Sequence, residues 1–136
     1  MYKITILIPF YNERGNIIRQ LQDLVSNLKN NNKCSFHITL VDDASTDEGP
    51  LEVEKFISEN EPNMFTFIKH QENLGKTGAI QSAFREINSD YVIFMDGDYQ
   101  DDPKDISIFI DKILLGYEVV IGNQQKQPKF LKKISV

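Results

Sequence analysis

In the stretch YVIFMDGDYQ, residues 91–100, an apolar run is followed directly by two aspartates separated by one glycine. An apolar run of this length is typical of a buried strand. Carboxylates are almost never buried unless something compensates their charge, so Asp96 and Asp98 at the strand exit require a cation. Mg²⁺ and Mn²⁺ take oxygen ligands and often bind between carboxylates and substrate phosphates. The stretch therefore predicts a metal-bridged phosphate site at the end of a sheet.

Outward from this stretch, strand and helix patterns alternate along the chain. We expect strands at residues 3–9, 36–41, 64–68, 91–95 and 118–121. We expect helices at residues 16–29, at 51–57, from a Thr77 cap through residue 87, and from Pro103 to residue 114, closed by Gly116. This order predicts an α/β fold, a mainly parallel sheet with right-handed crossovers and helices on both faces.

Composition narrows the function classes. The 136 residues suffice for one domain with a core, and the net charge of -5 argues against a nucleic-acid partner. The single Cys34 excludes a disulfide within the chain and a four-cysteine zinc site. The start resembles no signal peptide, and no run approaches the roughly 20 apolar residues of a membrane span. We therefore expect a cytoplasmic protein, and a peripheral one if it meets a membrane.

The polar clusters of the chain all follow expected strands, at residues 9–13, 42–47, 73–76 and 96–100. Ligands of parallel sheets bind beyond the carboxyl ends of the strands, so these clusters are expected to share one site. Lys76, just before a helix, is placed to meet phosphate, because helix N-termini offer partial positive charge and free N–H groups. The loop matches neither a P-loop nor a dinucleotide-binding glycine motif.

Each cluster also has a structural interpretation. Asp-Gly is common in ordinary turns, and Lys76 could be a solvated surface lysine. Asp42 or Asp43 could bind a base or ribose, whereas Ser45, Thr46 or Asp47 suit the cap of the next helix better. Tyr11 could stack on a base, and Glu13 could neutralise a helix N-terminus. We interpret His37 and His70 as structural, and Asp101, Asp102 and Asp105 as complements of a helix N-terminus.

Four segments in order resemble the family 2 glycosyltransferases of the GT-A fold. They are ITILIPFYNE at 4–13, LVDDASTD at 40–47, ENLGKTGAIQSAF at 72–84 and SDYVIFMDGDYQDDP at 89–103. The form Asp-x-Asp-x-Gln with a following Pro is most similar to the branch that transfers sugar to a polyprenyl or dolichyl phosphate. The resemblance implies a Rossmann-like nucleotide-binding half and metal-dependent, inverting transfer from a UDP- or GDP-linked sugar.

The resemblance also implies roles for individual residues. Asp96 and Asp98 would hold Mg²⁺ or Mn²⁺ against the donor diphosphate, with Gln100 as a further ligand. Asp43 would contact the base or ribose. The residues expected around the nucleotide are Pro9, Tyr11, Glu13, Asp43, Lys76 and Gly97, where Gly97 lets the backbone approach a ligand closely.

The resemblance places an acceptor site and a catalytic carboxylate downstream of the fifth strand. We therefore expect residues 1–122 to form the donor-binding domain and residues 123–136 to be a basic tail that begins an acceptor half, with the catalytic residue beyond Val136. The tail could lie at an anionic membrane surface or be an exposed helix or frayed end. The oligomeric state stays open.

Three other protein classes share parts of this sequence pattern. A truncated or non-catalytic nucleotide-binding remnant would share the donor site and differ only in turnover. A receiver-like signalling module needs an aspartate at the end of the third strand, where this chain has Ile68-Lys69-His70. A sugar nucleotidyltransferase needs a glycine-rich start, where this chain has Pro-Phe-Tyr-Asn-Glu.

Overall fold

The computed structural model describes residues 1–100, 102–117, 120–122 and 128–130. Four parallel strands form one sheet in the order β3-β2-β1-β4. The elements, with η for a short 3₁₀ helix, are β1 (Lys3–Phe10), α1 (Asn16–Lys29), β2 (Ser35–Asp42), α2 (Gly49–Glu59), η1 (Pro62–Met64), β3 (Phe65–Lys69), α3 (Gly75–Phe84), β4 (Tyr91–Phe94), η2 (Pro103–Asp105), α4 (Ile106–Leu114), β5 (Val120–Gly122) and β6 (Pro128–Phe130).

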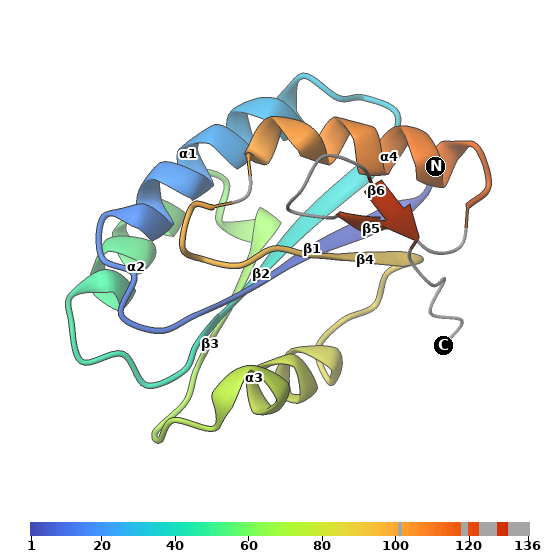
Figure 1. Cartoon of the computed structure of the whole chain (residues 1–136). Coiled ribbons are helices and arrows are strands. Elements are labelled where there is room, and N and C mark those ends of the chain that lie inside the picture. Colours follow the sequence, from blue (N-terminus) through green and yellow to red (C-terminus); the bar gives the residue numbers. More distant parts are fainter. Residues whose placement is uncertain (101, 118–119, 123–127, 131–136) are drawn as a thin grey trace.

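Helices cover both faces of the sheet, as the sequence predicted (Figure 1). Successive side chains of a strand point to opposite faces, so Ile6 and Ile8 of β1 pack on the side of α1, α2 and α4. Leu7 packs on the other side, against Ala79 and Ala83 of α3. The larger core therefore lies under three helices and the smaller one under α3 alone.

The apolar spacing of α1 explains its position. Ile17, Leu21, Leu24 and Leu28 recur at helical intervals, and all four side chains are buried against the sheet. Gln20 lies on the same stripe and is buried completely. A polar residue inside an apolar stripe needs hydrogen-bond partners, and those of Gln20 belong to the site described below.

The fifth strand differs from expectation. β5 pairs antiparallel with β6 in a separate two-stranded sheet and does not extend the parallel sheet. A short connection permits antiparallel pairing, whereas a parallel neighbour needs a long crossover. β6 falls within the expected tail. Residues 118–119 and the tail segments 123–127 and 131–136, with most of the tail lysines, lie outside the described residues.

Helix ends show which capping expectations hold. Asp47 accepts the Gly49 N–H (2.9 Å) at the start of α2, as expected. Asp102 accepts the Lys104 N–H (3.0 Å) at η2, and Gly116, with φ +91°, follows the end of α4. Asp101 lies outside the described residues. The Thr77 cap was wrong, because α3 already begins at Gly75.

Among the residues that the structure describes, no helix combines the length and the apolar character needed to cross a bilayer.

Candidate nucleotide-sugar site

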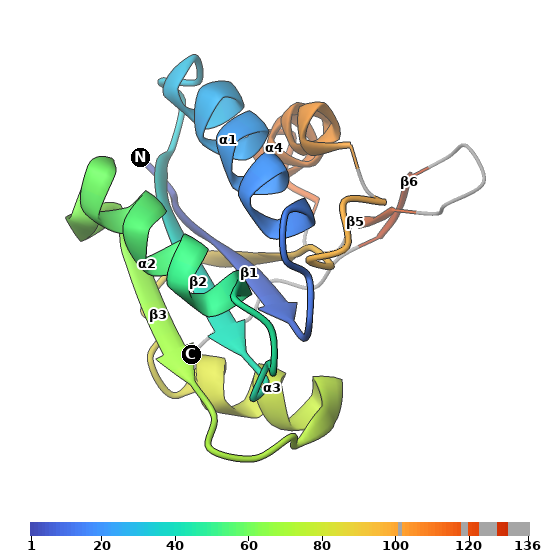
Figure 2. The same cartoon turned by 90° about the vertical axis from the view of Figure 1, so that its left-hand side faces the viewer.

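The polar loops after β1, β2 and β4 meet at one edge of the sheet. Figure 2 shows the arrowheads of β1, β2 and β3 ending on the same side. Asn12, after β1, accepts the Thr46 N–H (2.7 Å) and donates its own N–H to the Ser45 hydroxyl (2.9 Å). The Met95 N–H donates to the Leu7 carbonyl (3.0 Å), which keeps the chain beyond β4 beside the end of β1. The structure thus brings the predicted polar clusters together.

Asp96 and Asp98 follow β4 and remain accessible. Asp96 is 42% exposed in its side chain, and its Oδ1 lies 2.6 Å from the Nζ of Lys76 on α3. Asp98 is half-buried, and within the described part of the chain it accepts the nearby Gln100 N–H (3.1 Å). Gln100 is exposed. The two carboxylates therefore retain oxygen atoms that a ligand can reach.

These residues fit a hard cation. Carboxylate and amide oxygens are the ligands that Mg²⁺ and Mn²⁺ prefer, and the Lys76 ammonium already places a cationic group on Asp96. Within the described part of the chain, no group of three or more His, Cys, Asp or Glu could hold a metal. A cation here would need ligands from outside this carboxylate pair, as expected for a metal shared with substrate phosphates.

Gly97 packs closely against β1. A Cβ on Gly97 would lie 2.6 Å from the Phe10 Cβ and 3.2 Å from the Pro9 carbonyl oxygen. The backbone therefore approaches β1 closely at this point. The carboxylates of Asp96 and Asp98, on either side of Gly97, both stay partly exposed.

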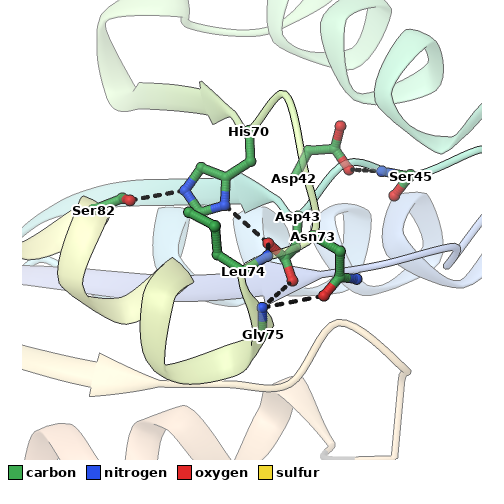
Figure 3. Close-up of polar contacts among 8 residues, drawn as sticks. All are labelled: Asp42, Asp43, Ser45, His70, Asn73, Leu74, Gly75 and Ser82. Carbon is green, nitrogen blue, oxygen red and sulfur yellow. Dashed lines mark hydrogen bonds and ion pairs between the residues drawn. The ribbon is translucent and has the colours of Figure 1, made fainter.

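Asp43 is enclosed by protein contacts, which Figure 3 shows. Its Oδ1 lies 2.9 Å from His70 Nδ1 and accepts the Leu74 N–H (2.8 Å), while Oδ2 accepts the Gly75 N–H (2.9 Å). The Nε2 of His70 lies 2.8 Å from the Ser82 hydroxyl on α3. The side chains of Asp43 and His70 are only 8% and 7% exposed. Asp43 thus caps α3 across a long sequence distance, in place of Thr77.

The charge of Asp43 is stabilised by these contacts. Burial is the largest influence and raises its pKa. The hydrogen bonds from His70, Leu74 and Gly75 together outweigh burial, so the pKa of Asp43 falls below its ordinary value. Asp42 is buried too, and its Oδ1 accepts the Ser45 N–H (2.9 Å). Both aspartates therefore organise the loops around the site.

The residues around the end of β1 are more exposed than Asp42 and Asp43. Tyr11 is 45% exposed, and its ring is available to a ligand. Glu13 is half-buried and accepts a hydrogen bond from the Asn16 side chain (3.2 Å). Pro9 is half-buried in β1.

The interpretation of both histidines as structural is confirmed by their contacts. His70 joins Asp43 to Ser82, and the Nε2 of His37 lies 2.7 Å from the Thr66 hydroxyl. Burial lowers the pKa of His37.

Sequence reasoning missed Gln20. Its side chain donates to the Asp96 carbonyl (2.6 Å) and accepts the Tyr99 N–H (3.1 Å). The available signal was a polar residue inside the apolar stripe of α1, three residues after Ile17 and four before Leu24.

A family model and curated relatives match this chain. The model of the family "Glycosyl transferase family 2" matches residues 5–134. Dolichyl-phosphate beta-glucosyltransferase of Saccharomyces cerevisiae is 34% identical over 113 residues, 81% of this chain and 34% of the relative. Undecaprenyl-phosphate 4-deoxy-4-formamido-L-arabinose transferase of Pseudomonas fluorescens is 32% identical over 129 residues, 93% of this chain and 37% of the relative. The chain spans about a third of the length of these curated relatives.

Solved structures share the fold. A mannosyltransferase from Pyrobaculum calidifontis, in complex with GDP-Man and Mn²⁺, superposes with a TM-score of 0.62 at 28% identity, over 70% of this chain and 27% of that one. TarS from S. aureus, residues 1-349, superposes with a TM-score of 0.64 at 21% identity, over 86% of this chain and 34% of that one, and supports the fold alone. The match of the family model over nearly the whole sequence shows that this chain belongs to glycosyl transferase family 2.

Proposed function

We propose that this chain binds the nucleotide-sugar donor for a metal-dependent, inverting glycosyl transfer to a polyprenyl phosphate, as the donor-binding part of a longer glycosyltransferase. The observation that carries the proposal is the pair of accessible carboxylates, Asp96 and Asp98, at the edge where three loops meet beside Lys76. A parallel sheet offers its ligand site at this edge.

Asp96 and Asp98 hold Mg²⁺ or Mn²⁺, and the exposed Gln100 supplies a further oxygen. When bound, the cation offsets the charge on the leaving nucleoside diphosphate. The carboxylate and amide oxygens of these side chains support this assignment. So does the Mn²⁺ in the complex of the Pyrobaculum calidifontis relative.

Lys76 and the loop after β1 bind the rest of the donor. Lys76 lies in the first turn of α3, where free N–H groups and a positive side chain favour phosphate. The exposed ring of Tyr11 stacks on the base, and Pro9 and Glu13 line the nucleoside pocket. Asp43 serves the nucleotide by fixing the start of α3, because its own oxygens are occupied by protein donors.

The acceptor class comes from the relatives. Two are named for transfer involving dolichyl phosphate and undecaprenyl phosphate, and both acceptors are polyprenyl phosphates. Such a lipid acceptor would bring the protein to the cytoplasmic face of a membrane. No catalytic base is assigned among the described residues.

Titration calorimetry tests the donor site. UDP and GDP are titrated into folded protein with and without Mn²⁺. We expect one nucleotide to bind, and Mn²⁺ to strengthen its binding. No binding of either nucleotide to folded protein would contradict the proposal. Release of nucleoside diphosphate in the presence of a polyprenyl phosphate then separates an active enzyme from a chain that only binds the donor.

A further inference from the structure

We infer that Gln20 is a positioning residue for the metal site, because its buried side-chain amide bonds the backbone at Asp96 and at Tyr99, on either side of Gly97 and Asp98. The inference rests on the proposed function and adds a residue on α1 that lies outside the four family-like segments. Gln20 touches neither the metal nor the nucleotide in this account. It acts through the loop that carries their ligands.

The amide of Gln20 matches this loop at two points. Its Nε2 donates to the carbonyl of Asp96 (2.6 Å), and its Oε1 accepts the N–H of Tyr99 (3.1 Å). These backbone groups lie immediately before Gly97 and immediately after Asp98. Only one orientation of the amide satisfies both, because a carbonyl needs a donor and an N–H needs an acceptor. One rigid side-chain group thus sets the distance between the two ends of the loop.

Burial makes this contact specific. Gln20 is completely buried, so solvent cannot replace a lost partner. A buried polar group without a hydrogen bond is unfavourable, which holds the amide and the loop in one arrangement. In turn, the loop supplies the hydrogen-bond partners that Gln20 needs inside the apolar stripe of α1.

The loop conformation needs such support. Tyr99 has φ +61°, in the left-handed region that residues other than glycine rarely adopt. Helix α1 also contacts the Tyr99 side chain. The Tyr99 hydroxyl donates to Asp23, and the Arg19 guanidinium lies 4.7 Å from the ring centroid. Gly97 packs against Phe10 on the remaining side. The loop is therefore held by α1 and β1, while the carboxylates of Asp96 and Asp98 stay partly exposed.

Residues that orient metal ligands affect metal affinity without touching the metal, by about 10- to 100-fold when removed. The test uses Gln20→Met, which keeps the length of the side chain and removes both hydrogen bonds. Gln22→Met is the matched control, since Gln22 is an exposed glutamine on the same helix. For both variants and the parent protein, the affinity for GDP and UDP is measured with and without Mn²⁺, together with thermal unfolding.

We expect Gln20→Met to reduce the Mn²⁺-dependent gain in nucleotide affinity about 10-fold or more, and to leave metal-free affinity unchanged. Gln22→Met should match the parent protein. An unchanged Mn²⁺-dependent gain in folded Gln20→Met overturns the inference. An equal loss with and without Mn²⁺ also overturns it, because that pattern indicates general loosening. If the parent protein shows no Mn²⁺-dependent gain, the proposed function itself fails.

Gln20→Asn, whose shorter amide cannot reach both backbone groups, takes the place of Gln20→Met if the latter does not fold, with the same expected and contradicting results. Tyr99→Phe tests the second contact of α1 with this loop. This change removes the hydroxyl bonded to Asp23 and disturbs no buried packing, since Tyr99 is only half-buried. We expect the Mn²⁺-dependent gain to fall about threefold, the size of one net hydrogen bond. A full gain in this variant would show that the Asp23 contact does not position the loop.

Discussion

The chain has two pairs of aspartates at strand ends, and they differ in what surrounds them. Asp42 ends β2 and Asp43 follows it; both are buried, Oδ1 of Asp42 accepts one backbone N–H, and both oxygens of Asp43 accept protein donors. Asp96 and Asp98 follow β4 and stay accessible, and the partner of Asp96 is an exposed lysine. The same side chain at the same kind of position therefore organises a loop in one case and is available to a ligand in the other.

The difference arises from the elements nearby. The start of α3 lies over Asp43 and presents two backbone N–H groups to it. After β4, Gly97 packs against Phe10, and the carboxylates of Asp96 and Asp98 stay partly exposed. Substitutions at the first pair should change stability, and substitutions at the second should change binding.

Asp43→Ala should have the largest effect on stability. It leaves His70 and the N–H groups of Leu74 and Gly75 without their acceptor, which should lower the free energy of unfolding by about 3–5 kcal/mol. Urea unfolding at neutral pH measures this change. Asp98→Ala is the control and should lower it by less than about 1 kcal/mol. Equal losses in the two variants would erase the distinction between the pairs.

Gly97→Ala should come next, because the new methyl group would lie 2.6 Å from the Phe10 Cβ. Overpacking of this kind lowers the free energy of unfolding by about 1–3 kcal/mol, and the displaced loop should also bind Mn²⁺ and nucleotide more weakly. Thermal unfolding and calorimetry report the two effects. A fully stable variant with normal binding would mean that the contact with β1 does not orient the carboxylates.

The pH dependence of stability should follow Asp43. Its pKa in the folded protein lies below the ordinary value of 3.8, so its contribution is present above that pH and is lost as pH falls through the folded pKa. The difference in unfolding free energy between the parent protein and Asp43→Asn should therefore shrink on acidification. Urea unfolding from about pH 6 to about pH 3 measures it. A difference that grows as pH falls would reverse the assigned sign.

Lys76→Met should have the smallest effect on stability. The ion pair with Asp96 is exposed on both sides, and such pairs contribute at most about 1 kcal/mol. Nucleotide binding without metal should nevertheless weaken, because a positive charge near the phosphates is lost. The exposed Lys29→Met serves as control. Metal-free binding that survives in Lys76→Met would remove Lys76 from the donor site.

Local patterns predicted the strands of the parallel sheet, the helices on both faces and the edge at which the polar loops meet, since these follow from apolar spacing and sheet geometry. They did not predict the cap of α3 by Asp43 or the partners of Gln20, because both depend on residues far apart in the chain. The antiparallel pairing of β5 was missed for another reason: the alternation of strands and helices favoured a fifth parallel strand, whereas β5 pairs with the nearby β6. The sequence placed Asp43 at the base or ribose and Asp98 at the metal, and only the tertiary contacts show that Asp43 is enclosed by protein donors while Asp98 stays partly exposed.

The central claim is that Asp98 binds the metal whereas Asp43 stabilises the fold. One paired measurement tests this claim. Asp98→Asn and Asp43→Asn are each titrated with GDP and UDP in Mn²⁺, and their thermal unfolding is recorded. We predict that Asp98→Asn loses the Mn²⁺-dependent gain in affinity at an unchanged unfolding temperature, while Asp43→Asn unfolds at a lower temperature. Retention of the full Mn²⁺-dependent gain by Asp98→Asn would contradict the account.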